Sequence, residues 1–246
     1  MNGDLFSKQS DFYSKFRPDY PLELYELVYR EVKRYNCAWD CATGNGQVAK
    51  VLANQFNTVK ASDISEAQLV KAYPKNNIQY SICPSESTSF PRRSFDLIAV
   101  GQALHWFNFK PFFEEVKRVS REKAVFAAWT YNLSTIEPDI DAIVSDLYTN
   151  ILDKYWAPER KHIECFYKSI PIPFDDLRSY KLIQIKEWDI EHYLGYLRSW
   201  SAVQKYIDEK AKNPVEIIEF DLRMKWGSGL REVKFPLSLK TAKINR

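Results

Sequence analysis

The stretch that decides the fold is WDCATGNGQVA, residues 39–49, in which two glycines follow a run of apolar and small residues. The segment CAWDCA, residues 37–42, is typical of a short buried strand, and residues 48–56 place their apolar side chains on one face of a helix. Glycine has no side chain to keep a ligand away from the backbone, so a loop of this kind between a strand and a helix suits close contact with a nucleotide. The stretch therefore predicts a strand, a nucleotide-binding loop and a helix.

Strand and helix patterns alternate on both sides of this loop through the first half of the chain. Helices are expected over residues 21–35, in the segment after the loop, from a Ser65–Gln68 capping box through Tyr73, and over PFFEEVKRV, residues 111–119. Strands are expected at TVKAS, IQYSIC, SFDLIAV and KAVFAAW. Strands that alternate with helices imply right-handed crossovers and a parallel sheet covered on both faces.

The second half of the chain is richer in helical patterns. Residues 138–154 predict one amphipathic helix, residues 191–211 one or two helices, and residues 214–226 a further helix that ends at Gly227. The segment YKLIQIKEW is a candidate strand, and the tail REVKFPLSLKTAKI alternates as a strand does. Pro236 interrupts that tail, which predicts a bulge or an edge position there. No internal repeat or low-complexity linker separates the halves, so we expect a single domain.

Composition narrows the class of protein. The 246 residues include 35 basic and 32 acidic side chains, a net charge of +3 spread along the whole chain, so no nucleic-acid partner is expected. The four cysteines form no CxxC pair, and no His, Cys and carboxylate spacing resembles a metal site. The beginning of the sequence has no signal-peptide pattern, and no apolar run approaches the roughly 20 residues that span a membrane. We therefore expect a soluble cytoplasmic protein with no membrane partner, and its oligomeric state is not indicated.

Two kinds of nucleotide fit the loop. Gly44, Gly46 and Ala49 match the GxGxxA form of the dinucleotide fingerprint, and Asp63 follows at the end of the next strand, which favours NAD. Asp40, however, places a carboxylate where a pyrophosphate needs neutral or positive surroundings. S-adenosylmethionine has no phosphate and carries a positive sulfonium, so an acidic residue attracts it. A nicotinamide-dependent oxidoreductase and a methyltransferase-like module that binds without catalysis stay as alternatives.

Motifs over almost the whole chain resemble one family. They are YSKFRPDYP, DCATGNGQ, ASDISEAQL, SESTSFPRRSFDLI, GQALHWFN, YLRSWSAVQKY and KFPLSLKTAK. The chain is similar to the class I S-adenosylmethionine-dependent methyltransferases, and more closely to the methyltransferase type 11 branch with its trans-aconitate methyltransferase-like enzymes. The resemblance implies a single α/β domain over residues 1–246 with a Rossmann-like, doubly wound, seven-stranded sheet, mostly parallel with an antiparallel C-terminal strand. Residues 131–226 would add a helical cap over the acceptor site, and the activity would be methyl transfer to a small molecule, with a carboxylate as a candidate acceptor.

The resemblance also implies the residues that bind the cofactor. The glycine loop would hold the methionine part, Asp63 the ribose and Ile64 the adenine, with further contacts at the adenine edge, near the sulfonium and from the segment that folds over the pocket. The full set is Tyr13, Arg17, Asp40, Ala42, Thr43, Gly44, Gly46, Asp63, Ile64, Ser85, Glu86, Gln102 and Ala103. Two departures from the family pattern stand out. Ala42 replaces a glycine, which is tolerable if its φ stays negative, and Cys83 with Pro84 replaces an aspartate near the adenine edge.

Four residues are candidates for the acceptor side. His105 could act as a general base, since imidazole titrates near neutral pH, or could only form a hydrogen bond across a turn. Trp106 and Trp129 follow strand ends and could form walls of the acceptor pocket or belong to the core. Arg198 could hold an acceptor carboxylate or pair with an acid on the surface. If the acceptor is a carboxylate no base is needed, so no single catalytic residue is expected.

Overall fold

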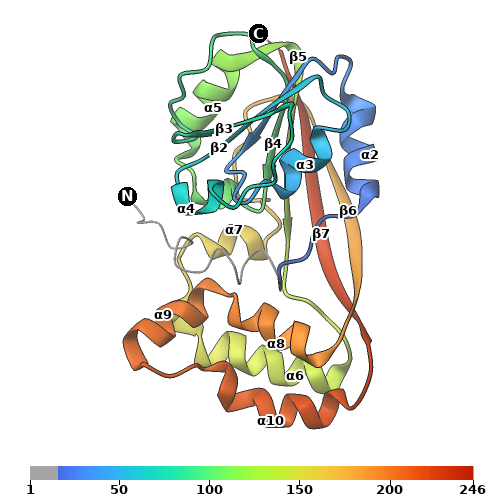
Figure 1. The fold of residues 1–246 in the computed structure, drawn as a ribbon, viewed down its shortest axis with the longest axis vertical. Coiled ribbons are helices and arrows are strands. Elements are labelled where there is room, and N and C mark those ends of the chain that lie inside the picture. The colour runs from blue at the N-terminus through green and yellow to red at the C-terminus, as the bar shows by residue number, and fades with distance from the viewer. Residues whose placement is uncertain (1–15, 246) are drawn as a thin grey trace.

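The computed structural model describes residues 16–245, which fold around a seven-stranded sheet (Figure 1). The strands are β1 (Cys37–Cys41), β2 (Thr58–Asp63), β3 (Ile78–Ile82), β4 (Phe95–Gly101), β5 (Ser120–Tyr131), β6 (Asp175–Trp188) and β7 (Arg231–Ile244). Their order is β3-β2-β1-β4-β5-β7-β6. Strands β1 to β5 pair in parallel, whereas β7 is antiparallel to both β5 and β6. The predicted Rossmann-like sheet with an antiparallel C-terminal strand is confirmed.

Helices cover both faces of the sheet, as expected for parallel strands. Helices α2 (Leu22–Glu31) and α3 (Gln47–Leu52) lie on one face, and α5 (Phe109–Val119) lies on the other (Figure 1). Neighbouring strand residues point to opposite faces, so the buried residues form two separate apolar cores. Trp39 belongs to the α5 side, and its indole N–H donates to the Ser62 hydroxyl at 2.8 Å. The central strands are therefore anchored on both sides.

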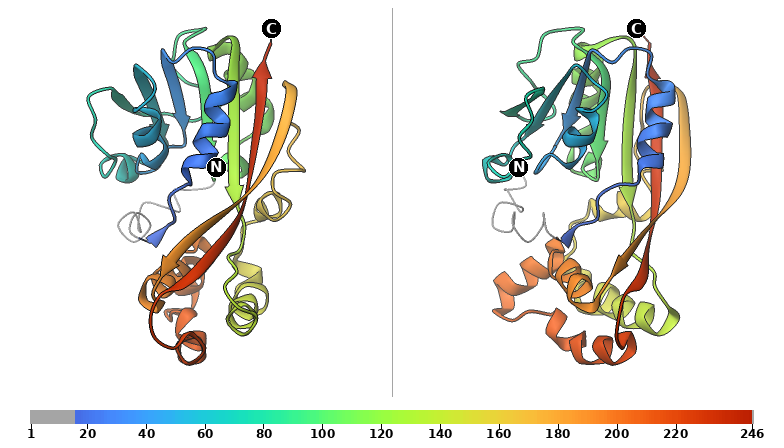
Figure 2. Two further views of the ribbon diagram at one scale, coloured as in Figure 1. Left: turned by 90° about the vertical axis from the view of Figure 1, so that its right-hand side faces the viewer. Right: turned by 45° about the vertical axis from the view of Figure 1, so that its right-hand side comes forward.

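A second layer of helices lies beyond the carboxyl ends of the parallel strands (Figures 1 and 2). It contains α6 (Pro138–Asp146), α8 (Ile190–Arg198), α9 (Ser201–Lys210) and α10 (Val215–Trp226), while the short α7 (Arg160–Glu164) lies between this layer and the sheet. Figure 2 shows the long strands β6 and β7 running from the sheet into the helical layer. Buried residues of α6, α8 and α10 join those of β7 in one continuous core. The two layers are thus packed together through apolar side chains.

Two of the predicted helices end before the expected residue. The helix predicted over residues 21–35 ends at Glu31, and the one expected from Ser65 through Tyr73 is only α4 (Glu66–Leu69), although Ser65 does cap it. After α4 the chain turns back, because the Tyr73 N–H donates to the Asn45 carbonyl of the glycine loop at 3.2 Å. A tertiary hydrogen bond thus replaces further helical turns.

The long helix predicted over residues 138–154 is interrupted. It consists of α6, a π-helical turn η3 (Leu147–Ile151) and a 3₁₀ turn η4 (Asp153–Tyr155). The Trp156 indole N–H donates to the Tyr148 carbonyl at 3.0 Å, and the Leu152 N–H bonds instead to the Leu147 carbonyl at 3.0 Å. Because the Trp156 side chain occupies the Tyr148 carbonyl, the Leu152 N–H bonds one residue further back, which makes the π turn.

The prediction for Pro236 was wrong, because β7 is an interior strand without a bulge at this residue. Lys234 exchanges two hydrogen bonds of 2.8 Å with Thr135, and the Pro236 carbonyl accepts from the Asn132 N–H at 2.9 Å. Lys234 and Pro236 are two residues apart in the strand, so their backbone groups point to the same neighbouring segment. The Pro236 nitrogen therefore faces the chain just beyond Tyr131, the last residue of β5. The missing N–H therefore removes no bond from the β5–β7 ladder.

Candidate active site

The site forms where the strand order reverses between β1 and β4. Ligands of open α/β sheets bind in the crevice at the carboxyl ends of the strands at such a point. Strand β1 leads there into the loop that contains Gly44 and Gly46, and β4 leads into Gln102, Ala103 and the 3₁₀ turn η2 (Leu104–Trp106). The topology therefore brings together the two motifs, DCATGNG and GQALHW, that lie far apart in the sequence.

Asp40 belongs to β1, and its buried carboxylate bonds to the glycine loop that follows. Only 1% of its surface is exposed, and its Oδ2 accepts hydrogen bonds from the Thr43 hydroxyl and from the Ala49 N–H, the latter at 2.8 Å. Burial raises the pKa of this carboxyl to about 7, and its two hydrogen bonds oppose that shift. Asp40 thus connects the loop to the first turns of α3, and its ionised form is costly until a positive charge comes near.

Asp63 fastens the same loop to the end of β2. Its Oδ2 accepts from the Gly44 N–H at 2.8 Å, and its Oδ1 accepts from the Ser65 N–H at 2.9 Å. A carboxylate accepts hydrogen bonds only, so Asp63 is of the residue type that suits the hydroxyls of a ribose. Gly46 has φ 84°, and a Cβ there would collide with the Tyr80 hydroxyl, so only glycine fits.

Ala42 departs from the expectation of a negative φ. Its φ is 55°, in the left-handed region that glycine adopts without cost. For an alanine this conformation costs about 1–2 kcal/mol. The methyl group packs against the core on the α5 side of the sheet. The replacement of the family glycine is therefore tolerated at a cost in backbone strain.

The surface beside Asp63 is unusually apolar. Ile64 is 61% exposed, and Ile82, which is paired with Asp63 across β2 and β3, is 57% exposed. A flat aromatic base would cover such side chains, so the residues present fit an adenine next to the ribose. Glu86 accepts from the Ser85 hydroxyl and from the Asn108 N–H, both at 2.9 Å. These bonds tie the predicted adenine edge to the start of α5.

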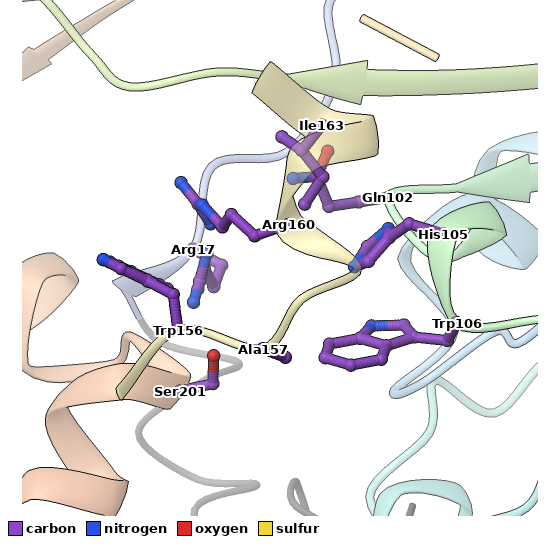
Figure 3. Close-up of a pocket in the computed structure, with 9 residues that line it drawn as sticks. All are labelled: Arg17, Gln102, His105, Trp106, Trp156, Ala157, Arg160, Ile163 and Ser201. Carbon is purple, nitrogen blue, oxygen red and sulfur yellow. The ribbon is translucent and has the colours of Figure 1, made fainter. Parts of the chain in front are cut away.

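A pocket of about 50 Å³ opens beside Gln102 (Figure 3). It is lined by Arg17, Gln102, His105, Trp106, Trp156, Ala157, Arg160, Ile163 and Ser201. The Gln102 side chain bridges β4 and β5, since its Oε1 accepts from the Tyr131 N–H at 2.8 Å and its Nε2 donates to the Tyr131 carbonyl at 3.2 Å. Ala103 is buried next to it. Two hydrogen bonds therefore fix the position of the Gln102 side chain in the pocket lining.

Two arginines give this pocket a positive charge. Arg17 donates to the Tyr131 hydroxyl at 3.0 Å and to the Ser199 carbonyl at 2.9 Å. The Arg160 Nε donates to the Tyr148 hydroxyl at 2.7 Å, and its guanidinium lies 4.2 Å from the centroid of the Trp156 ring. Neither Nη of Arg160 bonds to any residue between 16 and 245, and no acidic side chain from that range lines the pocket. The arrangement suits an anionic ligand.

Comparison with known proteins identifies the family. A family model described as a methyltransferase domain matches residues 39–128. A Dictyostelium discoideum protein classed as a methyltransferase is 34% identical over 250 residues, which cover 98% of this chain and 95% of the relative. A solved structure of a type II methyltransferase from Anaeromyxobacter dehalogenans is 36% identical with a TM-score of 0.85, over 94% of this chain and 99% of that one. The chain belongs to the class I S-adenosylmethionine-dependent methyltransferases.

The cofactor of this methyltransferase is accordingly S-adenosylmethionine. A phosphoethanolamine N-methyltransferase from Haemonchus contortus, solved with S-adenosylhomocysteine, shares only the fold, with 15% identity and a TM-score of 0.52 over 98% of this chain and 58% of that one. The assignment decides against the nicotinamide-dependent oxidoreductase and the non-catalytic module. No helix between residues 16 and 245 is long and apolar enough to cross a membrane.

His105 of the methyltransferase is a buried, neutral imidazole. It is 4% exposed, and its Nδ1 lies 3.2 Å from the Tyr167 hydroxyl. Burial lowers its pKa to about 3, and the nearby charges of Arg160 and His162 add to the effect. A group with this pKa is a weak proton acceptor at neutral pH, which favours a positioning role over general-base catalysis.

Two residues predicted for the acceptor side do not line the pocket. Trp129 is 1% exposed, and its ring packs edge-on against Tyr20 and Tyr25 in the core. Arg198 forms an ion pair of 2.5 Å with Glu219 on α10, and neither Trp129 nor Arg198 lines the pocket. Tyr13 lies outside the described residues.

Sequence reasoning missed Arg160, which comes from a segment without a recognisable motif. Its neighbours in the sequence, WAPERKHIE, resemble an ordinary polar helix start. Only the folded position of α7, between the sheet and the helical layer, directs this side chain to the pocket (Figure 3). No local pattern could have found it.

Proposed function

We propose that this methyltransferase transfers the methyl group of S-adenosylmethionine to a carboxylate oxygen of a small molecule bound beside Arg160. The observation that carries the proposal is the pair of arginines, Arg17 and Arg160, in a pocket to which residues 16–245 contribute no acidic side chain. A guanidinium offers parallel N–H groups that match the two oxygens of a carboxylate. A small pocket of this charge supports a small acid as the acceptor.

Arg160 is held ready for such a ligand. Its stacking on Trp156 and its hydrogen bond to the Tyr148 hydroxyl fix the plane of the guanidinium, and Tyr148 is itself held by Glu164 at 2.5 Å. The Nε is occupied, so the two Nη groups remain for the acceptor. Because the side chain is already ordered, little conformational entropy is lost when an anion binds.

The reaction requires orientation more than proton transfer. A carboxylic acid with a pKa near about 4 is already ionised at neutral pH, so its oxygen can attack without a base. This agrees with a neutral His105 whose pKa is lowered to about 3. The cofactor supplies a methyl carbon activated by its sulfonium; the new oxygen–carbon bond forms as the carbon–sulfur bond breaks. Fixing the two reactants in line can contribute up to about 7–11 kcal/mol.

For the cofactor side of the site we propose the assignment predicted from the sequence. In this proposal the loop around Gly44 and Gly46 receives the methionine part, Asp63 the ribose and Ile64 the adenine. The Asp63 carboxylate lies at the end of β2 beside the loop, and Ile64 exposes an apolar side chain next to it. The helical layer, with α7 at its edge, would close the acceptor side as the predicted cap.

An acceptor screen with two arginine variants tests the proposal. Small mono-, di- and tricarboxylic acids, amines and phenols are incubated with S-adenosylmethionine, and methyl products are identified by mass spectrometry. Arg160→Met should raise KM for the acid that is methylated by about 10- to 150-fold, through the loss of charged hydrogen bonds worth about 1.5–3 kcal/mol. The dissociation constant for S-adenosylmethionine should not change.

Arg198→Met is the matched control, since Arg198 is paired with Glu219 away from the pocket. It should leave KM unaltered. Methylation confined to amines or phenols would contradict the proposal, as would an unchanged KM in Arg160→Met or an equal rise in Arg198→Met.

A further inference from the structure

A second concave site lies at the opposite edge of the sheet, where the parallel strands begin. It is a cleft of about 590 Å³. Its lining residues are Lys33, Arg34, Arg93, Asp96, Arg121, Glu122, Lys123 and Ala124. Five of these are basic and two are acidic. The excess positive charge of the cleft therefore equals the net charge of +3 of the whole chain, although it comes from only eight residues.

An irregularity in β5 shapes this cleft. Phe95 pairs with Ser120, but Leu97 pairs with Val125, so one residue of β4 stands opposite four residues of β5. Residues 121–124, which stand opposite Asp96, all line the cleft. Lys123 and Arg93 have φ values of 60° and 56°, a conformation that costs a residue other than glycine about 1–3 kcal/mol. Strained positions of this kind cluster at functional sites.

Asp96 fixes two of the arginines. Its side chain is 3% exposed, and it forms ion pairs with Arg121 at 2.8 Å and with Arg34 at 3.5 Å. Arg121 Nε also donates to the Arg93 carbonyl at 3.2 Å, and Arg34 Nη2 donates to the Glu122 carbonyl at 3.0 Å. The two guanidiniums are therefore held in the wall of the cleft, where they offer their remaining N–H groups in a set geometry.

The other three cations, Lys33, Arg93 and Lys123, have no side-chain partner among the residues that the structure describes. Three positive side chains without a side-chain partner therefore surround two arginines that share one buried acid, Asp96. With Glu122 as the second acidic residue of the lining, the cleft keeps an excess of positive donors. Phosphate oxygens are strong acceptors for such donors. The cleft volume also lies in the range of about 300–1,000 Å³ that is typical of small-molecule sites.

We propose that this cleft binds a small polyphosphate anion, either free or as part of a nucleotide. The proposal is independent of the acceptor pocket, because the two sites lie at opposite ends of the parallel strands. A nucleic acid or an acidic protein is a less suitable ligand, since the basic residues converge on one cleft and the charge of the rest of the chain is balanced.

Calorimetric titration of the full chain with inorganic tripolyphosphate tests the proposal. Saturable binding with one ligand per chain is expected, and ATP should compete if the site accepts a nucleotide. The variant Arg93→Gln/Lys123→Gln should weaken tripolyphosphate binding at least about tenfold, through lost charged hydrogen bonds. The control Lys181→Gln/Lys212→Gln removes two exposed lysines elsewhere and should leave the affinity unchanged.

The dissociation constant for S-adenosylmethionine, measured in both double variants, should equal that of the unaltered protein and so reports correct folding. The proposal is overturned by absence of saturable tripolyphosphate binding, or by equal weakening in the control. Displacement of tripolyphosphate by S-adenosylhomocysteine would overturn it too, since the ligand would then share the cofactor site. Equally tight binding of polyglutamate or of a single-stranded oligonucleotide would assign the surface to a macromolecule instead.

Discussion

Binding of S-adenosylmethionine should become about tenfold tighter between pH 6 and pH 8 because Asp40 loses its proton over that interval. Burial raises the pKa of Asp40 to about 7 in the unliganded protein. At pH 6 roughly nine in ten molecules then carry a neutral Asp40, and at pH 8 roughly nine in ten carry the carboxylate. If the cationic cofactor binds the ionised form, the apparent affinity follows this population, and the change amounts to about 1.4 kcal/mol.

The pH dependence of folding stability has the opposite direction. The folded protein holds the Asp40 proton more tightly than the unfolded chain, whose carboxyl has the ordinary pKa of 3.8. This group therefore lowers the free energy of unfolding progressively from about pH 4 to about pH 7 when no cofactor is bound. Added S-adenosylmethionine should offset that loss. Thermal unfolding with and without cofactor, measured across this range, checks the sign.

Isothermal titration at several pH values, in buffers of different ionisation enthalpy, measures both the affinity and the protons released. Asp40→Asn cannot ionise and should flatten the profile. S-adenosylhomocysteine has no positive sulfur, so its profile should be shallower. A dissociation constant for S-adenosylmethionine that is the same at pH 6 and pH 8, or an undiminished slope in Asp40→Asn, would refute the electrostatic role of this residue.

Three further substitutions test the loop and the pocket. Gly46→Ala should lower the free energy of unfolding by about 1–3 kcal/mol, because φ is 84° and the new methyl group meets the Tyr80 hydroxyl; Gly46→Ala/Tyr80→Phe should recover part of the loss in urea denaturation. Asp63→Ala should weaken S-adenosylmethionine binding by about 1–3 kcal/mol in calorimetry, and an unchanged affinity would mean that the ribose is held elsewhere. Loss of a general base lowers kcat by about 10²- to 10⁴-fold, and His105→Gln should lower it far less. The pH–rate profile of the wild-type enzyme should show no inflection near pH 6.5 from this residue.

Sequence patterns predicted the local structure correctly where all the residues that determine it lie in one short segment. The glycines at 44 and 46 predict a strand–loop–helix unit because their positive φ values are a property of the loop itself. The Ser65 cap was also predicted, since its side chain bonds only three residues away. The length of the helix after Ser65 was not, because the bond between Tyr73 and Asn45 joins separate parts of the chain.

The sequence by itself determined the alternation of strands and helices, the glycine loop with Asp40 and Asp63, and the resemblance to a methyltransferase. Only the tertiary structure decided that the Asp40 carboxylate is buried, that Pro236 lies in an interior strand, and that Arg160 faces the pocket. The physical reason is the range of the interactions. Periodicity and capping act over a few residues, whereas burial, ion pairing and pocket shape depend on segments that meet only after the sheet and the helical layer have packed together.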